Sequence, residues 1–163
     1  MQIKKGTSAG AQLKTKEITL SLEENIKIGE IIIDSPGEYE VGGVFISGIP
    51  ASDEETIYII LAEGLNICYL GRLKKVLNGP ALEAASGADL LFLPIGAKET
   101  IEIKAALQLL QKINPRIVIP IFVENEAEFL KTEGISNPDR QSNFKLSTKD
   151  LPAEDDLKVV ILE

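Results

Sequence analysis

The hydrophobic pattern of this chain changes near Gly71, and this change constrains the fold more than any other feature. Before Gly71, short apolar runs follow one another with turn-forming clusters between them. Ile18, Leu20 and Leu22 alternate with polar neighbours, the period of two that is typical of a strand with one buried face. Further strand-like runs span residues 26–33, 43–49, 56–61 and 65–70. The first part of the chain is therefore expected to form an antiparallel meander.

Beyond Gly71 the pattern alternates between helix and strand. Three helices are expected: one from Pro80 to near Gly87, one from the N-cap Thr100 to before Pro115, and one from the N-cap Asn125 to about Thr132. Buried strands are expected at residues 90–93, 116–119 and 157–162. Strands first, and then helix and strand in alternation, indicate an α/β (α+β) sandwich with helices on an outer face.

Histidine is absent from the 163 residues, which restricts the chemistry available to the chain. Imidazole is the commonest general base near neutral pH and the usual nitrogen ligand of zinc. Ser-His-Asp catalysis, Cys-His catalysis and every His-dependent zinc site are therefore excluded. The 17 basic and 25 acidic residues give a net charge of −8, which disfavours a nucleic-acid partner. The composition, 44% apolar and 26% charged, is typical of a soluble globular protein.

The length of the chain favours a single intracellular domain. We place this domain at residues 12–163, after a flexible N-terminal segment at residues 1–11. The N-terminus lacks the apolar stretch of a secretory signal, and no run approaches the roughly 18 apolar residues of a membrane span. The single cysteine, Cys68, lies in an apolar run and is expected to be a buried, unreactive thiol. These features predict a cytoplasmic protein without a membrane partner.

Two local patterns have a catalytic and a structural interpretation. Residues 6–10 read Gly-Thr-Ser-Ala-Gly and match G-x-S-x-G, the pattern of a nucleophile elbow. No histidine is present to activate the serine and the following segment is strand-like, so a flexible linker is favoured. Acidic clusters at residues 53–55, 124–128 and 154–156 lack the spacing of a calcium loop, and we expect them to be solvated.

Residues 34–44 read Asp-Ser-Pro-Gly-Glu-Tyr-Glu-Val-Gly-Gly-Val. They resemble the D-G-P-G-E-Y-E-V-x-G-V segment of the metallo-β-lactamase-fold proteins, a family of zinc-dependent hydrolases. Residues 64–71 are similar to the start of the family's G-x-x-I-C-H-L-G-D-L-G-H. Shorter matches follow in the family's order at residues 48–50, 56–58, 93–96, 114–120 and 149–152, so that the likeness spans about residues 26–163. The resemblance implies an αββα sandwich whose members hold one or two metals at the sheet edge.

The metal-ligand positions of that family are replaced in this chain. The family's H-x-H-x-D-H segment is absent, and Asp53 follows directly where the family often has His-Asp. The resemblance places Tyr69 at a His position, Arg72 at a metal-ligating Asp and Phe122 at the last His. Phenylalanine offers no lone pair and a guanidinium carries a fixed positive charge, so this set is hostile to a divalent cation. We expect no metal and no cofactor, and hypothesise that Arg72 holds Asp53 in a bidentate pair instead.

The resemblance, together with the replaced metal-ligand positions and the absent H-x-H-x-D-H segment, predicts a metal-free, non-catalytic metallo-β-lactamase-like β-sandwich that is truncated at its N-terminus. A missing first half would leave a sheet edge or face uncovered, so we expect a homodimer with a self-complementary interface. One alternative is a protein that binds a small anionic ligand through Tyr69 and the basic patch of Arg72, Lys74 and Lys75, which otherwise forms a solvated loop. A second alternative is a residual hydrolase that uses carboxylates and a non-zinc metal.

Overall fold

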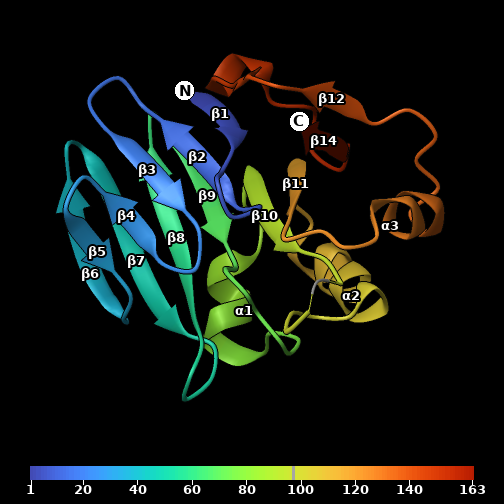
Figure 1. Ribbon diagram of the computed structural model, residues 1–163, viewed down its shortest axis with the longest axis horizontal. Helices are drawn as coiled ribbons and strands as arrows, with labels where there is room; N and C mark the ends of the chain where they lie inside the picture. The colour runs from blue at the N-terminus through green and yellow to red at the C-terminus, as the bar shows by residue number, and fades with distance from the viewer. Residues whose placement is uncertain (97) are drawn as a thin grey trace.

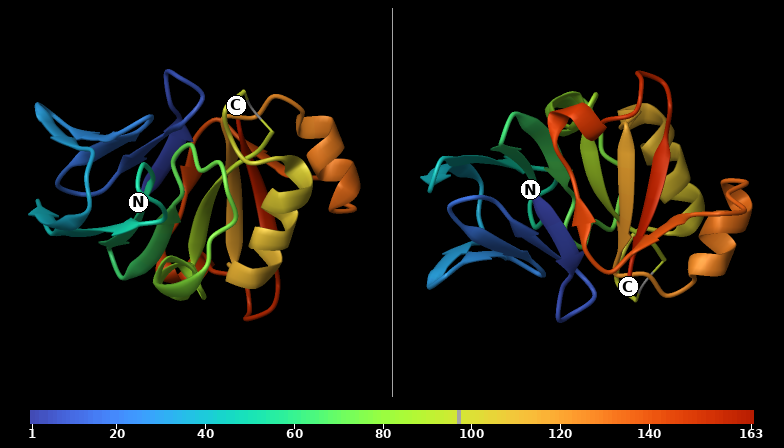
Figure 2. Two further views of the ribbon diagram at one scale, coloured as in Figure 1. Left: turned by 90° about the horizontal axis from the view of Figure 1, so that it is seen from below. Right: turned by 90° about the horizontal axis from the view of Figure 1, so that it is seen from above.

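Two β-sheets face each other, and helices cover the outer face of the larger sheet (Figures 1 and 2). The structure, a computed structural model, describes residues 1–96 and 98–163. In spatial order, the smaller sheet consists of β13 (Phe144–Lys145), β1 (Gln2–Lys5), β2 (Ala11–Lys14), β3 (Thr19–Leu22), β4 (Ile26–Ile28) and β5 (Ile31–Ile33). The larger sheet consists of β12 (Asp139–Gln141), β14 (Lys158–Leu162), β11 (Ile117–Ile121), β10 (Leu90–Pro94), β9 (Leu65–Tyr69), β8 (Thr56–Ala62), β7 (Val44–Pro50) and β6 (Gly37–Val41). The helices are α1 (Gly79–Ala85), α2 (Ile103–Ile113) and α3 (Glu126–Thr132), with a 3₁₀ turn at Thr148–Asp150.

The larger sheet changes from antiparallel to parallel pairing along its width. β6, β7, β8 and β9 form the expected antiparallel meander. β9, β10, β11, β14 and β12 are paired in parallel. Parallel neighbours need crossover connections, and α1 and α2 supply them between β9, β10 and β11. The carboxyl ends of β9, β10 and β11 therefore lie at one edge of the sheet.

Two apolar cores hold the layers together. The first lies between the sheets and includes Ile3 and Leu13 of the smaller sheet and Ile60 of the larger one. The second lies between the larger sheet and the helices. Successive strand residues point to opposite faces, so Cys68 enters the helix-side core while Tyr69 enters the core between the sheets. The predicted α+β sandwich with helices on an outer face is confirmed, and Cys68 is fully buried as expected.

Three local predictions need correction. Residues 2–5 of the segment expected to be flexible form β1, which is paired on both sides because Ile3 is fully buried in the first core. The run at residues 26–33 is a hairpin of two strands, not one, because Gly29 takes a positive φ of 57° and reverses the chain. Helix α2 begins at Ile103 with Glu102 as its N-cap, later than the N-cap at Thr100 would place it.

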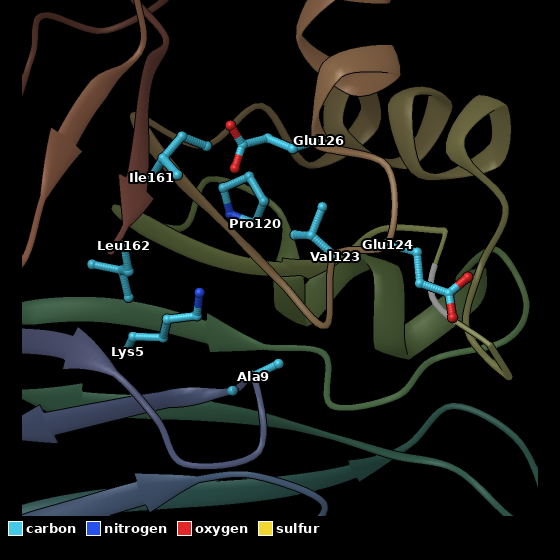
Figure 3. A pocket seen from close by; sticks show the side chains of 9 residues that line it. Lys5, Ala9, Pro120, Val123, Glu124, Glu126, Ile161 and Leu162 are labelled. Carbon is cyan, nitrogen blue, oxygen red and sulfur yellow. The ribbon is translucent and has the colours of Figure 1, made fainter.

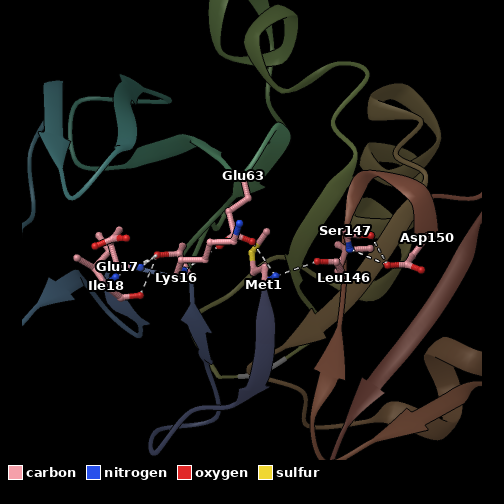
Figure 4. A network of polar contacts seen from close by, with 9 residues as sticks. Met1, Lys16, Glu17, Ile18, Glu63, Leu146, Ser147 and Asp150 are labelled. Atoms are coloured by element: carbon pink, nitrogen blue, oxygen red, sulfur yellow. Dashed lines mark hydrogen bonds and ion pairs between the residues drawn. The ribbon is translucent and has the colours of Figure 1, made fainter.

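A polar network joins the two sheets near Met1 (Figure 4). The Met1 ammonium donates hydrogen bonds to Glu63 Oε2 at 2.7 Å and to the Leu146 carbonyl at 3.1 Å. Glu63 Oε1 accepts a further hydrogen bond from the Lys16 N–H at 2.8 Å. The hydrogen bond from the ammonium is the main cause that lowers the pKa of the Glu63 carboxyl. Glu63 therefore ties the β8–β9 turn to the smaller sheet.

Candidate functional site

Three of the four predicted site residues meet at the carboxyl ends of β9 and β11. Tyr69 is the last residue of β9, Arg72 lies in the loop that follows, and Phe122 comes directly after β11. Glu23, which follows β3 in the smaller sheet, contacts Tyr69 across the space between the sheets. We refer to Glu23, Tyr69, Arg72 and Phe122 as the corner cluster.

Tyr69 connects the two sheets at this corner. Its ring is fully buried, lies 6.4 Å from the Tyr58 ring and meets the Phe92 ring edge-on at 6.3 Å, measured between centroids. Its hydroxyl donates a hydrogen bond to the backbone carbonyl of Glu23. Burial raises the pKa of the Tyr69 hydroxyl far above its ordinary value, and the nearby Glu23 carboxylate raises it further. The hydroxyl therefore remains protonated and acts as a donor, not as a phenolate ligand.

Arg72 lies over the ring of Phe122, with the guanidinium carbon 4.3 Å from the ring centroid. A cation in this position is attracted by the electron-rich face of the ring. Phe122 is only 3% exposed, and its φ of 51° is uncommon for a bulky residue. The Phe122 N–H donates to the Ala9 carbonyl at 2.9 Å, which helps to hold this conformation. The aromatic ring fills the corner, and the guanidinium covers it.

Glu23 is a buried carboxylate that sequence analysis did not single out. It is 9% exposed, and its Oε2 atom accepts hydrogen bonds from the backbone N–H groups of Ser8 at 3.2 Å and Gly10 at 3.3 Å. Successive backbone N–H groups that converge in this way form an anion-binding nest. The sequence signal for this site is faint: an acidic residue directly after the alternation that ends at Leu22.

The Gly-Thr-Ser-Ala-Gly turn of residues 6–10 wraps around this carboxylate. The Gly6 N–H donates to the Gly10 carbonyl at 3.0 Å and closes the turn. A Cβ at Gly6 would overlap the Glu23 side chain, and a Cβ at Gly10 would overlap the Leu22 carbonyl. Close packing against backbone thus requires glycine at position 10, whereas a side chain at position 6 would displace the Glu23 carboxylate. The turn is an ordered element and not the flexible linker that was expected, and Ser8 contributes its backbone N–H to it.

Asp53 lies outside the corner cluster. It is exposed in the loop between β7 and β8, and among the described residues no ion pair joins it to Arg72. The hypothesised bidentate pair is therefore not formed. The same loop turns a different carboxylate inward: Glu55 accepts hydrogen bonds from the Lys74 N–H at 2.6 Å and from the Ser52 hydroxyl at 3.2 Å.

A cleft of about 360 Å³ opens beside Arg72 and carries charges of both signs. Its cationic lining residues are Arg72, Lys74 and Lys75, and its acidic ones are Glu24, Asp34, Glu54, Glu55 and Glu99. Tyr58 also lines the cleft, and burial raises the pKa of its hydroxyl to about 12, so the phenol is neutral at physiological pH. Because carboxylates outnumber cations, the charge of the cleft does not favour an anion.

A smaller cavity of about 140 Å³ lies beside the N-terminal turn, where Ala9 and Gly10 line it (Figure 3). Lys5 of β1 and Glu126 of α3 line it, and Ile161 and Leu162 of β14 supply apolar walls. The Glu126 carboxylate is already ion-paired with Arg140. A second lining carboxylate, Glu124, accepts a hydrogen bond from the Lys98 N–H at 2.7 Å. Because both carboxylates already have partners and Lys5 is the single lysine of the lining, we assign no chemistry to this cavity.

The corner cluster does not fit a divalent metal. Tyr69 offers a protonated hydroxyl, Arg72 brings a positive charge and Phe122 has no lone pair. This leaves the Glu23 carboxylate, whose buried Oε1 accepts no hydrogen bond from the described residues, as the one candidate ligand of the cluster. Zinc centres need three or four nitrogen, sulfur or oxygen ligands. Across residues 1–96 and 98–163, no group of three or more His, Cys, Asp or Glu side chains is placed to hold a metal ion. The side chains at this corner therefore disagree with a zinc centre.

Fold and site together define an α+β sandwich in which Tyr69 and the Arg72–Phe122 stack occupy the strand-end corner. A cleft of about 450 Å³, lined in part by Ser8, Glu23 and Arg72, opens beside them. The sequence matches the family model of the beta-lactamase superfamily domain over residues 17–122, more than half of the 163 residues. The chain belongs to this family, which confirms the resemblance found in the sequence. No curated protein matches the chain. In the part of the chain that the structure describes, no helix is long and apolar enough to span a membrane.

Solved structures share the fold at low sequence identity. A proposed Zn-dependent hydrolase of the metallo-beta-lactamase superfamily from Thermotoga maritima is 23% identical with a TM-score of 0.78, over 99% of this chain and 100% of that one. A metallo hydrolase from Ignicoccus hospitalis is 18% identical with a TM-score of 0.50, over 72% of this chain and 61% of that one. A proposed metal-dependent hydrolase from Parabacteroides distasonis is 14% identical with a TM-score of 0.50, over 94% and 99%.

At these identities the similarity establishes the fold alone. This chain covers the whole T. maritima chain, so against that structure the truncation expected at the N-terminus is not seen. The six-stranded sheet, to which residues 2–33 contribute five strands, faces the larger sheet where a missing first half was expected.

Proposed function

We propose that this chain is a non-catalytic, metal-free member of the beta-lactamase superfamily that acts as an interaction module and self-associates. The observation that carries the proposal is the packing of Arg72 over Phe122 beside the Tyr69–Glu23 hydrogen bond. Tyr69, Arg72 and Phe122 stand at positions where the family resemblance places metal ligands, and none of the three offers a lone pair suited to a divalent cation. The chain is thereby suited to a structural role.

Electrostatics at the corner support a metal-free role. A divalent cation about 5 Å from a guanidinium meets a repulsion of about 7 kcal/mol at an effective dielectric constant of 20. One carboxylate, such as Glu23, at a similar distance offsets only that repulsion. No net attraction then remains to compensate for stripping water from the ion, which real metal sites achieve with several ligands.

The two alternative functions receive less support. A small anionic ligand would enter a cleft in which five carboxylates face three cations. A residual hydrolase that uses carboxylates would need them grouped around an ion, whereas Glu23 is held by the backbone of residues 6–10 and Asp53 lies in an exposed loop. We therefore do not advance either alternative.

Self-association is supported by the way the two sheets end on one side of the molecule. β5 is the last strand of the smaller sheet and β6 is the last strand of the larger one, and the chain passes directly from one to the other. Both strands leave backbone N–H and C=O groups without a neighbouring strand. Such edges are natural sites for pairing with another chain.

The decisive experiment compares the wild type with a variant in which three ligand positions are rebuilt. Wild-type protein incubated with zinc and desalted is expected to retain substoichiometric zinc and to leave β-lactam, phosphodiester and thioester substrates intact. The matched variant carries Tyr69→His, Arg72→Asp and Phe122→His, and is expected to retain more zinc than the wild type. Stoichiometric zinc in the wild type, with turnover that a chelator abolishes, would contradict the proposal.

A further inference from the structure

The two sheets end in four edge strands, and one of them lacks a charged residue. The edges are β13 with Lys145, β12 with Asp139 and Arg140, β6 with Glu38 and Glu40, and β5 with Ile31, Ile32 and Ile33. Charged side chains on an edge strand discourage pairing with another chain. Among the described strands, β5 is therefore the edge without this protection.

β5 lies at the outer end of the smaller sheet (Figures 1 and 2). This strand also exposes apolar side chains. Ile31 is 47% exposed and Ile32 is 56% exposed, while Ile33 is buried in the core. Isoleucine is β-branched and suits a paired strand. Covering these side chains would remove apolar surface from water, which favours association.

The free backbone groups of β5 belong to Ile32. β4 and β5 form a hairpin in which Ile28 pairs with Ile31 across a two-residue turn and Lys27 pairs with Ile32. A two-residue hairpin turn is closed by a hydrogen-bonded pair, and hydrogen-bonded and non-hydrogen-bonded pairs alternate along antiparallel strands. The Lys27–Ile32 pair is then the non-hydrogen-bonded kind. The N–H and C=O of Ile32 consequently point away from β4.

We propose that β5 pairs antiparallel with β5 of a second copy of this chain, centred on Ile32. The two Ile32 residues exchange N–H···O hydrogen bonds across a two-fold axis, and Ile31 of each copy faces Ile33 of the other. The contact is self-complementary, as a two-fold dimer requires, and doubles the six-stranded sheet. This assignment rests on the self-association proposed above and names the surface that mediates it.

Charge at the ends of the paired segment gives the dimer a distinctive salt dependence. In this register Glu30 of one copy faces Asp34 of the other, and each chain carries a net charge of −8. Like charges repel, and the Debye length falls from about 10 Å at 0.1 M salt to about 3 Å at 1 M. Association through β5 is therefore strengthened by salt. The paired segment is short, so a weak dimer is expected.

Cysteine cross-linking tests the register. Residues in a hydrogen-bonded antiparallel pair have Cα atoms about 5.5 Å apart, a separation that a disulfide spans. The variant Ile32→Cys, with oxidised glutathione as the oxidant, is expected to form a covalent dimer. The native Cys68 thiol is fully buried, so it leaves the assay free of background.

Two variants serve as matched controls. Ile31→Cys lies on the same strand, but the two positions are diagonal across the axis, about 7–8 Å apart, too far for an unstrained disulfide. Phe45→Cys on β7 is similarly exposed, at 51%, and reports random collisions. Ile32→Cys is expected to cross-link at least about five times faster than either control. Equal or faster cross-linking of Ile31→Cys or Phe45→Cys would overturn the register.

Sedimentation velocity tests the β5 interface separately from the proposals that the chain self-associates and binds no metal. The wild type is expected to dimerise as its concentration rises to roughly 0.5 mM, more strongly in 1 M salt than in 0.1 M. Ile32→Lys is expected to remain monomeric, whereas Phe45→Lys dimerises like the wild type. A dimer that survives Ile32→Lys overturns the β5 interface and leaves self-association standing. A wild type that stays monomeric overturns both, while the zinc test of the corner cluster is independent of either outcome.

Discussion

Glu23 and Glu63 make the same kind of contact at the two ends of β9, but in different surroundings. Glu23 lies beside Tyr69 at the carboxyl end of β9 and accepts two backbone hydrogen bonds from the N-terminal turn. Glu63 precedes β9 and accepts hydrogen bonds from the Lys16 N–H and the Met1 ammonium. Glu23 is 9% exposed, whereas Glu63 is exposed to solvent. Burial is thus the main difference between the two sites.

The comparison shows which of the two carboxylates contributes more to the stability of the fold. At the exposed site, water can replace a lost partner, so a surface ion pair contributes little. At the buried site, removing the carboxylate leaves N–H groups without a partner, and such groups carry the full cost of desolvation. We therefore expect the corner cluster, with the buried Glu23, to be more sensitive to substitution than the exposed Glu63 site.

The largest effect is expected from Glu23→Ala compared with Glu63→Ala. Glu23→Ala leaves the buried N–H of Gly10 and the partly buried N–H of Ser8 without an acceptor. The buried group costs about 1–3 kcal/mol and the partly buried one about 1 kcal/mol, so the free energy of unfolding should fall by about 2–4 kcal/mol. Glu63→Ala should cost less than about 1 kcal/mol. Urea denaturation of both variants measures the difference. Equal losses would remove the contrast between the two ends.

A smaller effect is expected where the N-terminal turn packs against β3. Gly10→Ala forces a methyl group against the Leu22 carbonyl and should lower stability by about 1–3 kcal/mol. Gly29→Ala is the control, because a Cβ there meets nothing within 4 Å and only its φ of 57° opposes the change. That strain should cost about 1 kcal/mol. If Gly10→Ala proves the milder substitution in thermal denaturation, the turn is not packed as described.

Arg72→Ala measures how much the contact between Arg72 and Phe122 contributes to stability. The variant loses the attraction between the guanidinium and the Phe122 ring, which is worth about 0.5–2 kcal/mol depending on burial. Arg72→Lys keeps the positive charge but loses the planar group that stacks on the ring, so it should recover part of that stability. Calorimetric melting temperatures rank the three proteins. An unchanged melting temperature for Arg72→Ala would show that the stack contributes nothing to the fold.

The smallest effect is the pH dependence of the Glu63 network. The pKa of Glu63 is lowered in the folded state, chiefly by the hydrogen bond from the Met1 ammonium, so its contribution is present above the unfolded pKa near 4.5. That contribution is lost as the pH falls through the lowered folded pKa. The stability difference between the wild type and Glu63→Gln should therefore be constant at mildly acidic pH and shrink below about pH 4.5. A difference that grows under acid would reverse the assigned sign.

Short-range signals in the sequence predicted local structure well where one side chain decides the outcome. The N-cap of α3 forms as expected, because Asn125 accepts a hydrogen bond from the Glu128 N–H at 3.1 Å, three residues along the chain. Thr100 did not fix the start of α2 in the same way. The N-cap rule requires only that a suitable residue precedes a helix, and tertiary packing selects where the helix begins.

The corner cluster shows what the sequence could not supply. Tyr69, Arg72 and Phe122 were identified through the family resemblance, and the parallel strands bring them to one edge. Glu23 and the order of residues 1–11 depend on contacts between distant parts of the chain, such as the bond between Ser8 and Glu23. No periodicity or spacing encodes such contacts. The exclusion of Asp53 likewise follows from the conformation of one loop.

The claim that the corner cluster does not bind a metal is tested most directly by crystallography with zinc. Crystals soaked in zinc should be measured on both sides of the zinc absorption edge, so that an anomalous difference map locates the ion. We predict no anomalous peak at the corner, with the Arg72 guanidinium still stacked on the Phe122 ring. A strong peak between Glu23 and Tyr69, with Arg72 displaced from the ring, would contradict the claim.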